Sequence, residues 1–163
     1  MEFVYNMPKL SKYFSWEEVT ASQTASREGI DNSIPPTLID TVSYIATRMD
    51  EVREVLGSAI IVTSWYRSPT LNALVKGSLN SQHMQGIAID FISPRYGKPH
   101  QICKALLRKK NSLNWDQLIL EHTWVHISFL PNIPNAKPRN QVLSLLDGGK
   151  YSNGLTDKQG NLL

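Results

Sequence analysis

The chain has 163 residues, of which 41% are hydrophobic and 19% are charged. This length and composition fit one domain with a buried core, and they exclude a disordered or low-complexity protein. The net charge of +3 suits contact with an anionic polymer without requiring one, and the single cysteine, Cys103, excludes an intrachain disulfide and a zinc site built from several thiolates.

The first third of the chain predicts two helices and a strand. Ser15, followed by Glu18 three residues later, is typical of a helix start and predicts a short first helix. Residues 36–56 carry apolar side chains at the period of an α-helix and end before Gly57, so they predict the main core helix. Residues 59–64 are rich in β-branched side chains and predict a buried strand.

The middle of the chain alternates between loops and regular elements. Pro69 opens a predicted short helix that extends through Val75. Residues 77–85 are polar and predict a loop, which leads into a second strand at residues 87–91. Residues 98–110 have apolar side chains on one face and basic ones elsewhere, and they predict an amphipathic surface helix.

The last third predicts a pair of strands and a tail. Residues 116–121 and 124–129 are strand-like and are separated by two residues, which predicts a tight hairpin or a bulged strand. Beyond Pro131 the chain is rich in Pro, Asn and Gly, with one apolar patch at residues 142–146. We expect this tail to wrap the domain and then fray.

These elements together predict an α+β fold. We expect a small, mainly antiparallel sheet, with the long helix on one face and a functional site on the other. The prediction is one domain over residues 1–163, with a core at about 10–130 and a C-terminal wrap and tail at residues 131–163.

The sequence also bears on where the chain acts. It begins without a basic region followed by an apolar run, so we expect no signal peptide and synthesis in the bacterial cytoplasm. No stretch approaches the roughly 18 to 20 apolar residues of a membrane helix, so we expect no membrane insertion. A role outside the cytoplasm then requires another agent to release the protein.

Three side chains point to metal chemistry. Asp90 stands in an apolar strand, where an unpaired charge is costly to desolvate. His126 lies in a strand of Val, Ile and Phe, and His83 lies in the preceding polar loop. Two histidines and one carboxylate are the protein ligands of many catalytic zinc sites. The alternative is that Asp90 pairs with an Arg or Lys and that each histidine is an ordinary hydrogen-bonded side chain.

Four short motifs occur together in one order along the chain. They are Ser64-Trp65-Tyr66-Arg67-Ser68-Pro69 with Leu71-Asn72, Ser81-x-His83-x-x-Gly86-x-Ala88-x-Asp90, the strand from Asp116 to Glu121, and Trp124-Val125-His126-Ile127-Ser128. In this order they resemble the zinc D-alanyl-D-alanine carboxypeptidase family of peptidoglycan peptidases, which includes cell-wall carboxypeptidases, vancomycin-resistance dipeptidases and phage endolysins. The resemblance runs from about residue 10 to about residue 129.

The resemblance implies a role for each motif residue. His83, Asp90 and His126 are the expected ligands of one zinc ion, and Glu121 is the expected general base. In several relatives the catalytic acid lies three residues before the last histidine, whereas Glu121 lies five before it. A bend in the predicted hairpin is therefore needed to bring Glu121 to the site.

Two further residues are expected to bind substrate. The resemblance implies that Arg67 holds a substrate carboxylate, for which a planar guanidinium is well suited, and that Ser81 adds a hydrogen bond to the same group.

The resemblance implies zinc-dependent hydrolysis of the peptidoglycan stem peptide, either next to a terminal D-Ala or between L-Ala and D-Glu. We expect a monomeric phage or prophage endolysin that acts on the cell wall after its release and does not bind nucleic acid. Two alternatives remain open: a non-catalytic zinc-containing module that binds cell wall or protein, and a virion-associated wall-degrading component.

Overall fold

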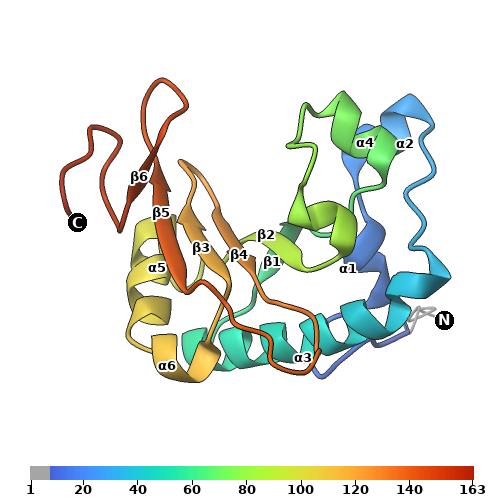
Figure 1. Cartoon of the computed structure of the whole chain (residues 1–163), viewed down its shortest axis with the longest axis horizontal. Coiled ribbons are helices and arrows are strands. Elements are labelled where there is room, and N and C mark those ends of the chain that lie inside the picture. Colours follow the sequence, from blue (N-terminus) through green and yellow to red (C-terminus); the bar gives the residue numbers. More distant parts are fainter. Residues whose placement is uncertain (1–7) are drawn as a thin grey trace, which may run out of the picture.

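The computed structural model describes residues 8–163. Within them six strands form one sheet in the order β1-β2-β4-β3-β5-β6 (Figure 1). All neighbouring strands are antiparallel except β3 and β5, which run parallel. The predicted α+β class with a mainly antiparallel sheet is confirmed. The strands are β1 (Ile61–Ser64), β2 (Ala88–Ile92), β3 (Gln117–Leu120), β4 (Val125–Ser128), β5 (Gln141–Leu145) and β6 (Tyr151–Asn153).

The predicted helices occur in the predicted order, and α2 is a further helix that the sequence analysis does not predict. The predicted first helix is confirmed, and the Glu18 carboxylate accepts a hydrogen bond from the Ser15 N–H at 2.8 Å. No helix within residues 8–163 is long and apolar enough to cross a membrane. The helices are α1 (Trp16–Thr20), α2 (Gln23–Glu28), α3 (Ile39–Leu56), α4 (Pro69–Leu74), α5 (Pro99–Leu107) and α6 (Lys110–Leu113).

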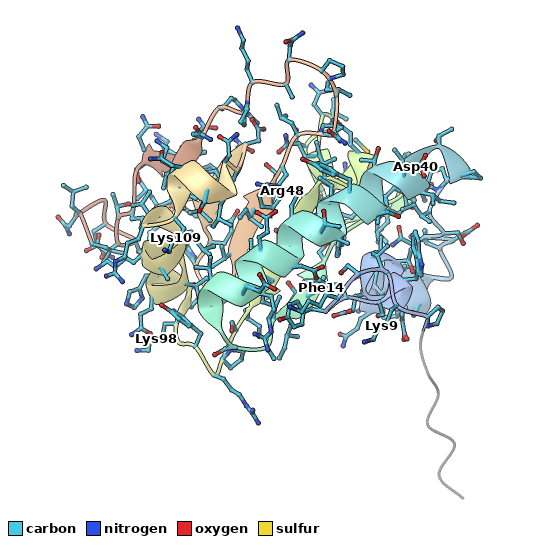
Figure 2. All side chains as sticks on the ribbon, turned by 90° about the horizontal axis from the view of Figure 1, so that it is seen from below. Lys9, Phe14, Asp40, Arg48, Lys98 and Lys109 are labelled. Atoms are coloured by element: carbon cyan, nitrogen blue, oxygen red, sulfur yellow. The ribbon has the colours of Figure 1, made fainter. Side chains whose placement is uncertain are left out.

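Helix α3 is the main core helix that the sequence predicts. It follows a 3₁₀ turn at Pro36–Leu38 and ends at Gly57, whose φ of 59° places it in the left-handed region. Seen from below, α3 crosses the length of the molecule and carries Asp40 near one end and Arg48 near its middle (Figure 2). The predicted helix at residues 98–110 is interrupted, because α5 ends at Leu107 and α6 begins at Lys110.

One face of the sheet forms the core with these helices. Alternate residues of a strand point to opposite faces, so the buried apolar residues of the central strands share one side. Each fully buried apolar side chain contributes about 1.5–3 kcal/mol, which makes this layer the main source of stability. The opposite face is left for polar side chains. The core residues at this interface include Val42, Ile45, Met49 and Val52 of α3, Ile102 and Leu106 of α5, and Ile89, Phe91, Leu118, Leu120, Val125 and Ile127 of the sheet.

The C-terminal segment corrects the prediction of a fraying tail. The apolar patch forms β5, which pairs in parallel with β3 through Leu118 opposite Val142. A turn then leads to β6, which pairs with β5 and forms the outer edge of the sheet (Figure 1). The strand ladder satisfies the backbone N–H and C=O groups that a frayed tail leaves to solvent.

Gly86, which precedes β2, supplies a test of how closely the chain packs on α3. Its φ is 70°, and a Cβ atom there would lie 2.7 Å from Cγ2 of Val42. We expect Gly86→Ala to lower the free energy of unfolding by roughly 2–4 kcal/mol, because the left-handed conformation and the steric clash both disfavour a side chain. Urea denaturation followed by circular dichroism measures this loss.

The matched control is Gly57→Ala. Gly57 has a similar φ of 59°, but a Cβ atom there would have nothing within 4 Å. We expect this variant to lose only the roughly 1–2 kcal/mol of the left-handed conformation. Equal losses in the two variants would contradict the close contact with Val42.

Candidate metal centre

The register of the central strands places two of the predicted ligands side by side. Asp90 of β2 lies opposite His126 of β4, and His126 lies opposite Ile119 of β3. Residues that pair across strands share one face of the sheet. Because Ile89 and Ile127, the sequence neighbours of these two ligands, belong to the core, Asp90 and His126 project from the opposite face.

The third predicted ligand, His83, comes from the 3₁₀ turn before β2. Its Nδ1 lies 2.7 Å from the carbonyl oxygen of Trp65. A carbonyl oxygen only accepts, so Nδ1 carries the proton and Nε2 presents its lone pair. The Trp65 indole N–H also donates to the Gly86 carbonyl at 2.9 Å, and the Arg67 N–H donates to the His83 carbonyl at 3.2 Å. These bonds fix the direction of the His83 ring.

The three side chains converge on one point. His126 Nδ1 lies 2.8 Å from Asp90 Oδ1, and His83 Nε2 lies 3.3 Å from Asp90 Oδ2. One donor atom from each residue lies within 4.8 Å of the others. A tetrahedral zinc ion with bonds of about 2.0–2.2 Å needs such closely spaced donors, and two imidazoles with one carboxylate are a donor set that zinc accepts. The residues present therefore fit a zinc ion.

The protonation states also suit metal binding. Burial raises the pKa of Asp90, but the hydrogen bond from His126 and the proximity of the His83 ring outweigh it and hold the pKa below its usual range. Burial lowers the pKa of His83, although Asp90 opposes this effect. A carboxylate and a neutral imidazole are the forms that bind metal ions.

Arg67 and Ser81, the predicted substrate-binding residues, both line the cleft that contains the three ligands. Arg67 donates from Nη2 to Asp90 Oδ2 at 3.2 Å and from Nε to Ser64 Oγ at 3.1 Å. The pairing of Asp90 with an arginine, considered above as an alternative, is thus present together with the histidine contacts. Ser81 Oγ accepts a hydrogen bond from the His83 N–H at 3.3 Å. Their contact with substrate stays a prediction.

Glu121 reaches the same cleft through the predicted hairpin. Its N–H donates to the Trp124 carbonyl at 3.1 Å, which closes a tight turn between β3 and β4. Glu121 lies two residues after Ile119 and therefore faces the side of the sheet that carries His126. It lines the cleft of about 360 Å³ with the three ligands, and burial raises the pKa of its carboxyl group.

His122, next to Glu121, turns away from this centre. It is exposed, its Nε2 lies 3.2 Å from the Leu145 carbonyl, and it lines a different hollow on the far side of the hairpin.

Sequence reasoning missed two residues that line the cleft. Tyr151 donates a hydrogen bond to Glu121 Oε1 at 3.2 Å, and Arg139 binds both carboxylate oxygens of Asp116. Both missed residues lie in the segment predicted to fray. The signal that could have found Tyr151 is the turn sequence Asp147-Gly148-Gly149 after an alternating apolar run, which is typical of a hairpin.

Arg139 and Asp116 stabilise the turn that carries His83 through hydrogen bonds. Asp116 is buried, and its Oδ2 accepts hydrogen bonds from Arg139 Nη2 at 2.6 Å and from Gln82 Nε2 at 2.8 Å. Since Gln82 immediately precedes His83, this pair links the C-terminal segment to the metal centre.

Comparison with known proteins agrees with this site. A family model described as Peptidase M15 matches residues 12–128, which contain the three candidate ligands, Glu121, Arg67 and Ser81. A search of curated proteins finds no significant match.

The ligand assignment predicts which variants lose zinc. We expect His83→Ala, Asp90→Ala and His126→Ala each to lower zinc affinity by at least one order of magnitude, because each removes a donor atom. Isothermal titration of the metal-free protein with zinc measures the affinity. The matched controls are His100→Ala and His122→Ala, which remove histidines outside the cluster within residues 8–163. Loss of zinc binding in a control, with retention in a ligand variant, would contradict the assignment.

The buried Asp116 predicts a pH-dependent contribution to stability. Burial raises the pKa of Asp116, but hydrogen bonds from Arg139 and Gln82 outweigh it and lower the pKa. The stabilisation is therefore present above the unfolded pKa of about 3.9 and disappears as the pH falls through the lower folded value. We expect Asp116→Asn to lose roughly 1–2 kcal/mol at pH 7 and progressively less in acid.

Urea denaturation at several pH values tests this expectation. Glu54→Gln is the control. Glu54 forms an ion pair with Lys12 in which both side chains are exposed, so the pair should contribute about 0.5 kcal/mol or less to stability. A loss in Asp116→Asn that does not change between pH 7 and pH 3 would contradict the assigned role of the carboxylate charge.

Proposed function

The chain belongs to the peptidase M15 family, a family of zinc-dependent peptidases, and from this premise we propose that its substrate is the stem peptide of peptidoglycan. The observation that carries the proposal is the cleft itself. His83, Asp90 and His126 gather beside Glu121 and Arg67 in one open hollow of about 360 Å³. This arrangement supplies a zinc site, a carboxylate base and a cationic group within reach of one bound peptide.

The metal-binding residues and Glu121 have different roles in the proposed hydrolysis. The chemistry that a zinc ion held by His83, Asp90 and His126 supplies is Lewis-acid activation of water and of a carbonyl group. Glu121 accepts a proton from the attacking water as the new C–O bond forms. The same carboxyl group then returns the proton to the leaving amine as the C–N bond breaks. The raised pKa of Glu121 suits both steps, because it brings the group closer to neutral pH.

Several features favour a polymeric, acidic substrate. Arg67 carries a guanidinium that is well suited to bind a substrate carboxylate, and the chain has a net charge of +3. Arg67 also lines a second cleft of about 660 Å³ beside β1. Arg67 is thus a lining residue of both clefts. The proposal includes both cleavage next to a terminal D-Ala and cleavage between L-Ala and D-Glu.

The biological setting follows from the substrate. A phage or prophage endolysin degrades the peptidoglycan of its bacterial host after it is released to the cell wall. We propose this role for the chain as a monomer. A virion-associated wall-degrading component uses the same chemistry. A non-catalytic binding module predicts a base displaced from the cleft, so the position of Glu121 favours hydrolysis.

The test is digestion of purified peptidoglycan by the zinc-loaded protein and by Glu121→Gln. We expect the wild type to release stem-peptide fragments and the variant to be slower by about 10²–10⁴-fold, because a positioned general base contributes about this much. Mass spectrometry of the fragments identifies the bond that is cleaved.

The control for this test is metal content. Glu121→Gln should bind one zinc ion as the wild type does, since Glu121 lies outside the ligand cluster. If both proteins bind zinc and neither releases any fragment, the proposed substrate is wrong and the binding-module alternative takes its place.

A further inference from the structure

Tyr151 lies outside the part of the chain that matches the family, yet it lines the active-site cleft. The family match ends at residue 128, whereas Tyr151 begins β6. Its hydroxyl donates a hydrogen bond to Oε1 of Glu121 at 3.2 Å. Within residues 8–163 this is the one side-chain hydrogen bond made by the Glu121 carboxylate.

The sheet register explains how two residues so far apart in sequence meet. Leu120 pairs with Ser144 of β5, so Glu121 lies beside Leu145, and Leu145 pairs with Tyr151 of β6. The three residues form a row across the sheet and share one face. Two strand spacings amount to about 10 Å, a gap that a tyrosine and a glutamate can bridge above the leucine between them.

The hairpin that carries Tyr151 is well anchored. The Leu146 N–H donates to the Lys150 carbonyl at 2.7 Å, which closes the turn. The buried Ser144 donates from Oγ to the Gly154 carbonyl at 2.8 Å and accepts from the Thr156 N–H at 3.0 Å. Tyr151 is therefore presented by a folded hairpin.

The phenol of Tyr151 keeps its proton at neutral pH. Burial and the negative charge of Glu121 raise the pKa of Tyr151 to about 12. A protonated hydroxyl facing a carboxylate acts as the donor. The hydrogen bond is thus made to the charged form of Glu121, the form that a general base requires.

We infer that Tyr151 is a positioning residue, whose hydroxyl holds one carboxylate oxygen of Glu121 so that the other faces the attacking water. This inference rests on the proposed function. A glutamate side chain has several rotatable bonds, and catalysis depends on holding the reacting group within about 0.5 Å of its productive place. The C-terminal hairpin thus takes part in the chemistry of the site.

The variant that tests the inference is Tyr151→Phe, which removes only the hydroxyl. We expect kcat to fall roughly 3–10-fold with KM unchanged, because a charge-assisted hydrogen bond that orients the base is lost. A fall expressed only in KM would instead indicate direct contact with substrate and overturn the positioning role. Zinc content should equal that of the wild type.

The pH profile provides a second readout. Loss of a hydrogen bond to the charged form raises the pKa of Glu121, so the acid limb of kcat/KM should move up by about half to one pH unit. The other charged and titratable groups near Glu121 are unchanged by the substitution, including Arg67 and Arg139, which line the same cleft. The remaining groups are Asp90 on β2, His126 on β4, His122 in the hairpin turn, and Lys98 and Lys158 in the hollow beyond it.

A third readout does not depend on activity. The ¹³C chemical shift of the Glu121 carboxyl, assigned by its absence in Glu121→Gln, reports its titration in the metal-free protein. We expect Tyr151→Phe to raise this pKa and Tyr96→Phe, which removes a hydroxyl from a surface loop, to leave it unchanged. Thermal unfolding checks that both variants are folded.

The outcomes separate the two proposals. If the wild type is active and Tyr151→Phe matches it in kcat, pH limb and carboxyl titration, the positioning role is wrong and the proposed function stands. If the wild type cleaves no peptidoglycan, the proposed function fails, and the positioning role fails with it whatever the titration shows.

Discussion

A carboxylate buried within an apolar strand is the constraint on which the rest of the structure depends. Asp90 is only 7% exposed and lies between two core residues. An uncompensated charge at this place would cost several kcal/mol, so the fold must surround the Asp90 carboxylate with polar or positively charged side chains. It does so from three segments: His126 from the neighbouring strand, His83 from the preceding turn and Arg67 from the loop after β1. The same arrangement that stabilises the carboxylate also brings together the three side chains that could bind a metal ion.

The apolar layer beneath the sheet makes this convergence rigid. Trp65 is fully buried, and it binds the His83 turn at two points, through its carbonyl and its indole N–H. Asn32 joins the N-terminal segment to the same loop, since it donates to the Tyr66 carbonyl and accepts from the Ser68 N–H. Each of these hydrogen bonds joins residues far apart in the sequence and is modest in energy, but together they hold the side chains of the site in place. Such preorganisation is what a metal centre and a catalytic base both require.

The sequence predicts those parts of the site that local patterns encode. His83 and Asp90 lie on one turn and the strand that follows it, and the hairpin predicts that Glu121 bends toward His126. The sequence does not predict the contacts of Arg139 and Tyr151, because they depend on β5 pairing in parallel with β3. Which strand β5 pairs with depends on contacts between distant parts of the chain. The spacing of apolar residues predicts a strand but does not predict its neighbour in the sheet. The apolar patch at residues 142–146 favours a strand, but its sequence does not indicate the position of that strand in the sheet.

Strand β3 connects the C-terminal segment to both ends of the centre. At its start, Asp116 binds Arg139 and, through Gln82, the turn that carries His83. Just past its end, Glu121 binds Tyr151. Tyr151, which lies beyond the family match, thus contacts Glu121 directly, and Arg139 reaches the turn that carries His83 through Asp116. Substitutions of Tyr151 or Arg139 remove hydrogen bonds to Glu121 or Asp116 and replace no metal-binding side chain. The conformation of Glu121 and the geometry of the metal-binding side chains therefore depend on different elements, because the first depends on β6 and the second on β2, β4 and the turn that carries His83.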